Sequence, residues 1–386
     1  MEIAAITQMQ SGYKGWPEAY VRQSTRGNKN GSMAAWLSPQ MDDPAWDEFL
    51  QNCPFGQYQQ SSRWAKVKAV DGWEPIRIVF SLDRQVVGGF QMLVRRGRMG
   101  KIGYISKGPA LALEDSAWAN FAIEALFSTV RQHGLQAVLL QPPDRSKLYE
   151  RWLPARQPLL ANHLTPVIES TLLVDLSEGM EAIRRRMRKR TRLEIRQAEE
   201  RGIRIREGGE RDIGTFFRLM AATCERQRTR PNPASERALL EVWRGFHGQG
   251  CARLMFSEFQ GKPVAGLFSL GFGDTATCWK RGWSGDHRDL HPNQPLTLDA
   301  IEWAHRMEYK FFDFCSLRPD IAAAMLQGQP LSEDQRKSRD YVNLNYGNLP
   351  VILPESRVYF RNPLARAVYR IAIKIPPLRD RLRRLG

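Results

Sequence analysis

The sequence predicts an α/β protein of the α+β kind, with two similar halves that each combine a mixed sheet with flanking helices. Its 386 residues exceed the comfortable size of a single hydrophobic core, so two domains are expected. Hydrophobic residues make up 42% and charged residues 25%, which is typical of a globular chain. A strand–turn–strand pattern, followed by another strand, a helix and a short strand, occurs twice in the same order.

The first copy of this pattern follows two short predicted helices. Apolar runs separated by turn residues indicate its hairpin, and a glycine and a Pro-Pro pair mark the ends of its last helix and strand. In chain order, the sequence predicts helices over 42–50 and 61–70, strands over 75–81, 86–95 and 101–105, a helix over 114–133, and a strand over 137–141.

The second copy follows a strand and a long basic helix. Its hairpin resembles the first one, because both second strands open with valine, a small residue and glycine, at Val87-Gly88-Gly89 and Val264-Ala265-Gly266. In chain order, the sequence predicts a strand over 170–175, helices over 178–201, 210–226 and 234–247, strands over 252–259, 264–272 and 276–281, a helix over 295–307, and a strand over 310–314.

Changes in composition predict four segments. Residues 1–33 are polar and aperiodic, which is typical of a flexible leader. The two copies of the pattern then define domains over 34–168 and 169–345. We expect the segment 346–386 to return to the first domain and to end in a basic tail.

The charge and the cysteines limit the class of protein. The formal net charge is +16, and a basic excess of this size usually reflects an anionic partner. The five cysteines are scattered and lack C-x-x-C spacing, which favours a reducing compartment. Neither a secretory signal nor an uninterrupted run of 18 apolar residues occurs. We therefore expect a soluble cytoplasmic protein whose contact with a membrane, if it has one, is peripheral.

Many short stretches follow the order and spacing of one known family. They are Gln60-Ser61 with Trp64 and Lys68, Gly72-Trp73, Val87-Gly88-Gly89, Lys107-Gly108-Pro109, Lys189-Arg190-Thr191-Arg192 with Ile195, Ala198, Gly202 and Ile203, Gly282-Trp283-Ser284, Pro292-Asn293 with Leu296, Ala300-Ile301 with Trp303-Ala304, and Asp313-Phe314. Between about residues 34 and 363 the chain thus resembles the FemAB/FemX group, aminoacyl-tRNA-dependent transferases that add amino acids to peptidoglycan precursors.

The resemblance implies two tandem domains with the GNAT acyltransferase fold, whose core order is hairpin, strand, helix and strand. It also implies an N-acyltransferase or aminoacyltransferase that uses no cofactor and takes aminoacyl-tRNA or acyl-CoA as its cosubstrate. The acceptor would be an amine on a cell-envelope precursor, either sugar-nucleotide or lipid-linked, or on a polysaccharide.

The region 184–206 holds eleven basic residues against three glutamates. Such an excess repels itself unless an anion is present, so this region could grip tRNA phosphates, a sugar-nucleotide diphosphate or lipid head groups. Arg188 and Arg192 are the candidates for donor binding. The alternatives are a merely solvated helix and, by the resemblance, a structural role for part of the charge at the domain interface.

The resemblance places an acceptor cleft between the domains and implies which side chains line it. Lys68 and Trp64 would come from the first half, and Arg226 and Arg228 from the second, because an acidic acceptor needs fixed cations. The alternative is that Trp64 belongs to the core while Lys68 extends along apolar surface. Trp279 and Lys280 are further candidates, and core packing is the alternative for Trp279.

The start of the helix expected from Pro295 can hold a donor phosphate, because a helix start presents unpaired N–H groups. Asn293 and Gln294, just before it, are the candidates. Ordinary GNAT enzymes carry a Q/R-x-x-G-x-G/A loop there for coenzyme A, and this sequence lacks it. Its absence favours a tRNA donor over acyl-CoA.

The chemistry expected is attack of an amine on an activated ester, with the oxyanion held by N–H groups or a cation. In the family a Phe-Lys pair near the chain end supplies that charge, and the resemblance places the lysine at Asn343, which is uncharged. Asp313 and Glu302 are the acidic candidates for a base, with helix capping or bracing of a loop as the alternative for Asp313. His287, His291 and His305 lack further ligands at metal spacing, so no metal site is expected.

The tail 357–386 has nine basic residues, one acidic residue and apolar residues at near-helical spacing. This pattern is typical of an amphipathic helix on an anionic membrane, and docking on the first domain is the alternative. A non-catalytic protein that binds RNA or lipid also stays open, because Asn343 carries no charge.

Overall fold

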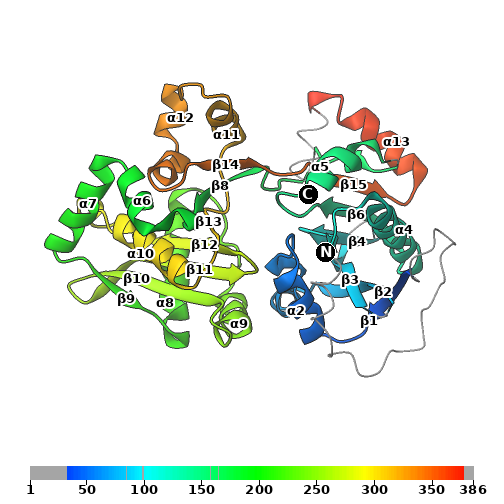
Figure 1. Cartoon of the computed structure of the whole chain (residues 1–386), viewed down its shortest axis with the longest axis horizontal. Helices are drawn as coiled ribbons and strands as arrows, with labels where there is room; N and C mark the ends of the chain where they lie inside the picture. Colours follow the sequence, from blue (N-terminus) through cyan, green and yellow to red (C-terminus); the bar gives the residue numbers. More distant parts are fainter. Residues whose placement is uncertain (1–32, 84, 98–99, 157, 164, 378–386) are drawn as a thin grey trace. The chain divides into compact units, whose positions relative to one another are not determined.

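The computed structural model describes residues 33–83, 85–97, 100–156, 158–163 and 165–377 (Figure 1). The chain divides into two compact units, Met1–Val167 with Pro354–Gly386 and Ile168–Leu353. Each unit contains one mixed sheet with helices, so the predicted fold class is confirmed. The predicted leader, except Met33, lies outside the described residues.

The first unit contains the first copy of the predicted pattern and, from the chain end, one strand and one helix. Its elements are β1 (Met33–Ser38), α2 (Pro44–Asn52), η1 (Tyr58–Gln60), α3 (Ser62–Ala69), β2 (Glu74–Leu82), β3 (Gln85–Gly97), β4 (Gly100–Ser106), β5 (Ala110–Leu111), α4 (Ser116–Gln132), β6 (Leu135–Gln141), α5 (Lys147–Trp152), η2 (Leu153–Ala155), β7 (Leu160–Ala161), β15 (Arg357–Phe360) and α13 (Pro363–Ala372).

The sheet of the first unit has the order β1-β2-β3-β4-β6-β15-β7, with β5 paired to β3. Only β4 and β6 run parallel within this sheet of the described chain, because α4 carries the chain back between them. Their pairing extends from Lys101 opposite Leu135 to Ser106 opposite Gln141, so β4 is paired to its carboxyl end.

The two faces of this sheet are packed differently. Apolar residues of α4, including Ile123 and Leu126, form a core against one face. On the other face, Arg77 is 1% exposed and donates to Gln91 Oε1 at 2.8 Å. Gln60, also buried, donates to the Ser106 carbonyl at 2.7 Å and thereby ties η1 to the sheet. The hydrogen bonds offset the cost of burying these polar groups.

The second unit contains the second copy of the pattern. Its elements are β8 (Ser170–Asp175), η3 (Leu176–Glu178), α6 (Gly179–Arg186), α7 (Lys189–Glu200), β9 (Arg204–Glu207), η4 (Glu210–Asp212), α8 (Ile213–Arg226), α9 (Glu236–His247), β10 (Ala252–Phe259), β11 (Lys262–Phe272), β12 (Thr275–Trp283), η5 (Arg288–Leu290), α10 (Asn293–Arg306), β13 (Phe311–Asp313), α11 (Pro319–Leu326), α12 (Glu333–Lys337), η6 (Arg339–Asn345) and β14 (Leu349–Ile352).

The sheet of the second unit has the order β14-β8-β13-β12-β11-β10-β9. The parallel pair here is β12 and β13, connected by α10, as β4 and β6 are connected by α4. This pair is short: only Thr275, Ala276 and Thr277 of β12 lie opposite β13. The rest of β12 pairs with β11 alone.

Helices cover both faces of this sheet. The largest core of the unit joins α10, α6 and α7 to one face, through residues such as Ile301, Ile183 and Ile195. The other face carries an aromatic layer in which Phe216 of α8 and Trp243 of α9 meet Phe268 edge-on. Figure 1 shows α8 and α9 beside this sheet.

Two expected helices differ from the structure. The helix expected over 178–201 is two helices, α6 and α7, with extended backbone at Met187 and Arg188. Met187 is 2% exposed, so its burial in the core fixes the break. In the tail, Val358 and Phe360 belong to strand β15, and only Pro363–Ala372 is helical, as α13. Strand β1 was not predicted.

Gly282 allows α8 to pack directly on β12. A Cβ at this position would lie 2.6 Å from the Met220 backbone nitrogen. We predict that Gly282→Ala lowers the free energy of unfolding by about 1–3 kcal/mol, because backbone must shift to admit the methyl group. Urea unfolding tests this. Gly248→Ala is the control, since nothing lies within 4 Å of its added Cβ. Equal effects of the two variants would contradict the prediction.

Candidate functional site

The carboxyl half of β12 has an unpaired edge. After Thr277 no described strand pairs with it on the side of β13, so this stretch can receive another group. Arg281 packs on the α10 side of the sheet, where its guanidinium lies 5.4 Å from the Phe314 ring centroid. Trp283, two residues further along, packs against the same core.

Arg281 is the most unusual side chain at this edge. Its Nε donates to Cys278 Sγ at 3.0 Å, and its Nη1 donates to Asn343 Oδ1 at 3.1 Å. Its Nη2 is buried and has no hydrogen-bond partner among the described residues. Arg281 is half-buried as a residue, but a buried Nη2 without a partner is costly and needs an explanation. A bound anion, or an oxygen that becomes negative during a reaction, would supply the missing partner.

A cavity of about 620 Å³ lies near Arg281 and Asn343, which do not line it themselves: Trp283, two residues after Arg281, and Val342, next to Asn343, are part of its wall. We call it the basic cavity. Three arginines contribute to its wall, and the full lining is Arg188, Arg190, Thr191, Glu194, Trp283, Arg288, His291, Pro292, Asn293, Gln294, Tyr341, Val342 and Asn345.

Two helices begin at the basic cavity, α7 at Lys189 and α10 at Asn293. Neither start receives a hydrogen bond from an N-cap side chain. Helix starts carry partial positive charge, which favours an anion in the cavity. The α7 start also offers free N–H groups, whereas at the α10 start the Gln294 N–H donates to the His291 carbonyl at 3.2 Å and Pro295 has no N–H.

Tyr346 holds the start of α10 in place through a hydrogen bond. It is 2% exposed, and its hydroxyl donates to the Gln294 carbonyl at 3.1 Å. Burial raises the pKa of Tyr346, which Arg281 lowers only in part, so the hydroxyl stays protonated and remains a donor. The tyrosine therefore connects the α10 start to the surroundings of Arg281.

The arginines of the basic cavity differ in their partners. Arg190 pairs with Glu194 at 2.8 Å, and the Arg188 guanidinium lies 4.3 Å from the Tyr341 ring centroid. Glu194 also accepts from Gln294 Nε2 at 3.2 Å. Arg288 is exposed, and no ion pair to it is found within the described ranges. Arg288 is therefore best placed to meet an incoming anion.

Of the residues predicted to bind the donor, Asn293, Gln294 and Arg188 meet in the basic cavity. Arg192 does not line it. Its Nη1 donates to the carbonyls of Arg184, Arg185 and Met187 at 2.6–3.1 Å and caps the end of α6. These contacts give Arg192 a structural role, and donor binding by it stays a prediction.

Many arginines of the basic region 184–206 form ion pairs within the protein. Six of its arginines contact carboxylates, and five of their partners lie outside the region, which hid them from the sequence pattern. The pairs are Arg184–Glu302, Arg185–Glu181, Arg186–Glu178, Arg190–Glu194, Arg196–Glu200, and Arg206 with Asp212 and Glu258. The region is thus less free to bind anions than its composition predicts, although exposed pairs of this kind are weak.

The predicted acceptor residues of the first unit lie on α3. Lys68 forms an ion pair with Asp71 at 3.1 Å, and its side chain is 22% exposed. Trp64 is half-buried and meets the Tyr58 ring edge-on at 5.1 Å. These contacts give both side chains a structural role, and acceptor binding by them stays a prediction.

Arg226 and Arg228 lie at the end of α8 in the second unit. The Arg226 guanidinium donates to the carbonyls of Ser284 at 2.8 Å and Trp283 at 2.6 Å, so it holds the loop after β12. Arg228 is exposed, with a left-handed backbone at φ 54°. Acceptor binding by these arginines stays a prediction.

Trp279 lies in the core, as the alternative interpretation had it. The residue is 7% exposed, and its ring meets Phe268 edge-on at 5.3 Å. It is the extra residue of a β-bulge, since Phe268 pairs with Lys280 and Ser269 with Cys278. Lys280 Nζ lies 5.5 Å from the Trp279 ring centroid. The bulge therefore helps to set which face of β12 carries Arg281.

The two predicted catalytic residues have different surroundings. Asn343 contacts Arg281, as described, beside the basic cavity. Asp313 accepts from the Thr171 hydroxyl and from the Cys315 backbone N–H, and so braces the loop after β13. This bracing favours the structural interpretation of Asp313.

Sequence reasoning missed Arg281, Arg288 and Tyr341. The available signal for Arg281 was a charged residue in a largely buried strand, which it shares with the adjacent Lys280. Arg288 and Tyr341 come from the short helices η5 and η6, whose positions depend on the fold, so no local pattern reveals them.

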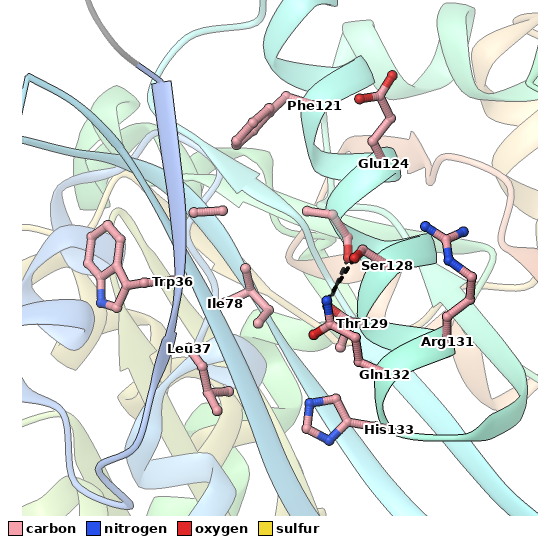
Figure 2. Close-up of a pocket in the computed structure, with 12 residues that line it drawn as sticks. Trp36, Leu37, Ile78, Phe121, Glu124, Ser128, Thr129, Arg131, Gln132 and His133 are labelled. Carbon is pink, nitrogen blue, oxygen red and sulfur yellow. Dashed lines mark hydrogen bonds between the residues drawn. The ribbon is translucent and has the colours of Figure 1, made fainter. Parts of the chain in front are cut away.

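A second cavity, of about 420 Å³, lies in the first unit between the edge strands and α4. Figure 2 shows Trp36 and Leu37 of β1 and Ile78 of β2 across from Phe121 and other α4 residues. Burial, with help from Lys101, lowers the pKa of His133 at its rim. No residue predicted to bind substrate lines this cavity.

The described residues contain neither a metal-ligand cluster nor a membrane-spanning helix. Within the described ranges, no three His, Cys, Asp or Glu side chains are grouped so as to hold a metal ion. No helix among these residues is long and apolar enough to cross a bilayer.

Comparisons with known proteins match both units. Residues 41–152 match the FemAB family, and residues 185–320 match an acetyltransferase (GNAT) domain. A lipid II:glycine glycyltransferase of Staphylococcus saprophyticus subsp. saprophyticus is 23% identical over 237 residues, which are 58% of this chain and 56% of that protein. One of Staphylococcus haemolyticus is 21% identical over 56% of this chain and 54% of that protein. The chain thus spans about half the length of these curated relatives.

Solved structures extend the likeness of the fold over both units. The crystal structure of FemX superposes with a TM-score of 0.69 at 14% identity, and covers 87% of this chain and 99% of FemX. A protein of unknown function from Bacteroides thetaiotaomicron VPI-5482 gives a TM-score of 0.50 at 12% identity, and covers 84% and 99%. These structures show the likeness of the fold, and the matches of residues 41–152 and 185–320 make the chain FemAB-like with a GNAT domain.

The basic cavity should bind a diphosphate. We predict that inorganic pyrophosphate raises the melting temperature of the protein, and that Arg288→Gln weakens this binding about tenfold, because a charge-assisted hydrogen bond is lost. Thermal-shift titration measures both. Arg244→Gln is the matched control, since Arg244 is an exposed arginine paired with Glu210 on the far side of the sheet from α10. Equal titrations for the two variants would contradict the assignment.

Proposed function

We propose that this FemAB-like protein of the GNAT superfamily is an acyltransferase that moves an aminoacyl group onto an amine of a cell-envelope precursor. One observation carries the proposal: the buried Nη2 of Arg281 has no partner among the described residues and lies beside Asn343 and the basic cavity. The relatives named lipid II:glycine glycyltransferases support this class of reaction.

The proposed chemistry gives each group at β12 a role. The acceptor amine attacks the ester carbonyl of the donor, and negative charge develops on the carbonyl oxygen. Arg281 Nη2 stabilises that oxygen, while Asn343 holds the guanidinium in place through Nη1. A C–N bond forms and the C–O bond breaks, and the proton lost by the amine passes to the departing hydroxyl. In this scheme Arg281 replaces the lysine that the family resemblance places at Asn343.

The basic cavity is the proposed place for the phosphates of the donor. Its two helix starts and Arg288 suit either a tRNA end or the pyrophosphate of coenzyme A. The missing Q/R-x-x-G-x-G/A loop favours aminoacyl-tRNA. The match to an acetyltransferase (GNAT) domain supports acyl-CoA as the second candidate.

We further propose that the acceptor is a lipid-linked precursor met on the cytoplasmic side of a membrane. The names of the relatives favour a lipid-linked acceptor over a sugar nucleotide. The five cysteines are free, which suits a reducing compartment. Arg228, which is exposed, is the best placed of the predicted acceptor residues.

The donor is tested by a transfer assay with the full chain. We expect label to pass from charged tRNA to lipid II or to its soluble precursor, and no label to pass from acetyl-CoA. Transfer from acetyl-CoA alone would replace the first donor by the second. Salt-dependent tRNA binding without any turnover would leave the chain a binding protein and contradict the proposal.

The role of Arg281 is tested by substitution. We predict that Arg281→Met lowers kcat by about 10²–10³-fold with little change in KM, because a cation acting on the developing oxyanion is lost. Adding Asn343→Lys to that variant should recover part of kcat, since the new lysine carries the charge to the same place. Steady-state kinetics measures both variants.

A purely structural Arg281 predicts a different outcome. In that case Arg281→Met would lower the melting temperature along with activity, and the lysine at 343 would rescue neither. We expect the melting temperature of Arg281→Met to change little, because an unpaired buried cation contributes little stability. Parallel thermal unfolding distinguishes the two roles.

A further inference from the structure

Helix α13 exposes a line of large apolar side chains. Leu364 is 70% exposed, Val368 58%, Ile371 60% and Ile375, just after the helix, 45%. The spacing of three and four residues places the first three on one side of an α-helix. We call these four residues the apolar stripe. Leaving such side chains in water is unfavourable, so a partner is expected.

The fold of the first unit does not use the apolar stripe. The opposite side of α13 is anchored through Tyr369, which is 5% exposed. Its hydroxyl donates to the Ala161 carbonyl at 2.8 Å and accepts from the His163 backbone N–H at 3.0 Å. Its ring also packs on Phe360 at 5.0 Å. The helix is therefore held with its stripe facing outward.

The charge around the stripe has one sign. The segment 356–377 contains five basic residues and no acidic residue. Arg361, Arg370 and Lys374 are exposed. This combination of exposed apolar and basic residues matches an anionic lipid surface. The apolar side chains and the aliphatic parts of arginine and lysine would contact the acyl chains, and the charged groups would contact the lipid phosphates.

We propose that α13 docks the protein on an anionic membrane, lying in the plane of the interface with its apolar stripe inserted. A second copy of the chain is disfavoured as the occupant, because two such segments would bring like charges together. This proposal extends the proposed function by giving the surface that reaches a lipid-linked acceptor. It is separable from that function, because docking needs neither donor nor acceptor.

The test is co-sedimentation of the full chain with large unilamellar vesicles. We expect binding to vesicles that contain 30% phosphatidylglycerol in phosphatidylcholine, and at least tenfold weaker binding to phosphatidylcholine alone. The triple variant Leu364→Ser, Val368→Ser, Ile371→Ser should bind the anionic vesicles at least tenfold less. These side chains are exposed, so the variant should keep the melting temperature of the wild type.

The matched control is Leu326→Ser, which changes a 59% exposed leucine at the end of α11 and should leave binding unchanged. Equal binding by the triple variant, or no binding by the wild type, would overturn the proposal. Sedimentation velocity tests whether a second copy of the chain occupies the apolar stripe. A dimeric wild type together with a monomeric triple variant would assign the stripe to self-association instead. Transfer to a soluble acceptor should persist in the triple variant, whereas failure of the proposed function would abolish transfer in the wild type.

Discussion

The candidate site depends on the early end of one strand. Because β13 stops at Asp313, only three residues of β12 have a parallel partner, and the edge beyond Thr277 is unpaired. On this stretch of β12 the Arg281 side chain donates to Asn343, and the nearby Tyr346 donates to Gln294 at the start of α10. The loop after β13 is braced by Asp313 itself.

The first unit has the same order of elements, but its corresponding strand edge is fully paired. There β4 is paired along β6 up to Ser106, so the edge is closed. Just beyond it, Lys107 pairs with Asp144, which also accepts from Gln57 Nε2 at 2.9 Å. A buried cation with its own carboxylate needs no ligand, unlike Arg281. The two halves of one repeated pattern have thus diverged: in the described chain, the second unit alone leaves an unpartnered guanidinium at this edge.

Periodicity and turn residues were sufficient to predict the repeated hairpin, strand, helix and strand, while anion binding at the start of α10 stays a prediction. Tertiary contacts decided the rest. The break between α6 and α7 carries no proline or glycine and results from burial of Met187. The basic region looked free because the carboxylates that neutralise it, such as Glu302 and Glu258, come from distant elements. Arg281 became a candidate only when the short pairing of β13 and the contact with Asn343 were known, and neither is visible in the sequence.

The central claim is that Arg281 receives the carbonyl oxygen of an acyl donor whose phosphates lie in the basic cavity. A crystal structure with a short RNA bearing a non-hydrolysable 3′-aminoacylamino end, which mimics a charged tRNA, tests it most directly. We expect the aminoacyl carbonyl oxygen to lie within about 3 Å of Arg281 Nη2, and a phosphate to lie at the start of α10. An aminoacyl end bound elsewhere, with Arg281 Nη2 still lacking a partner, would contradict it.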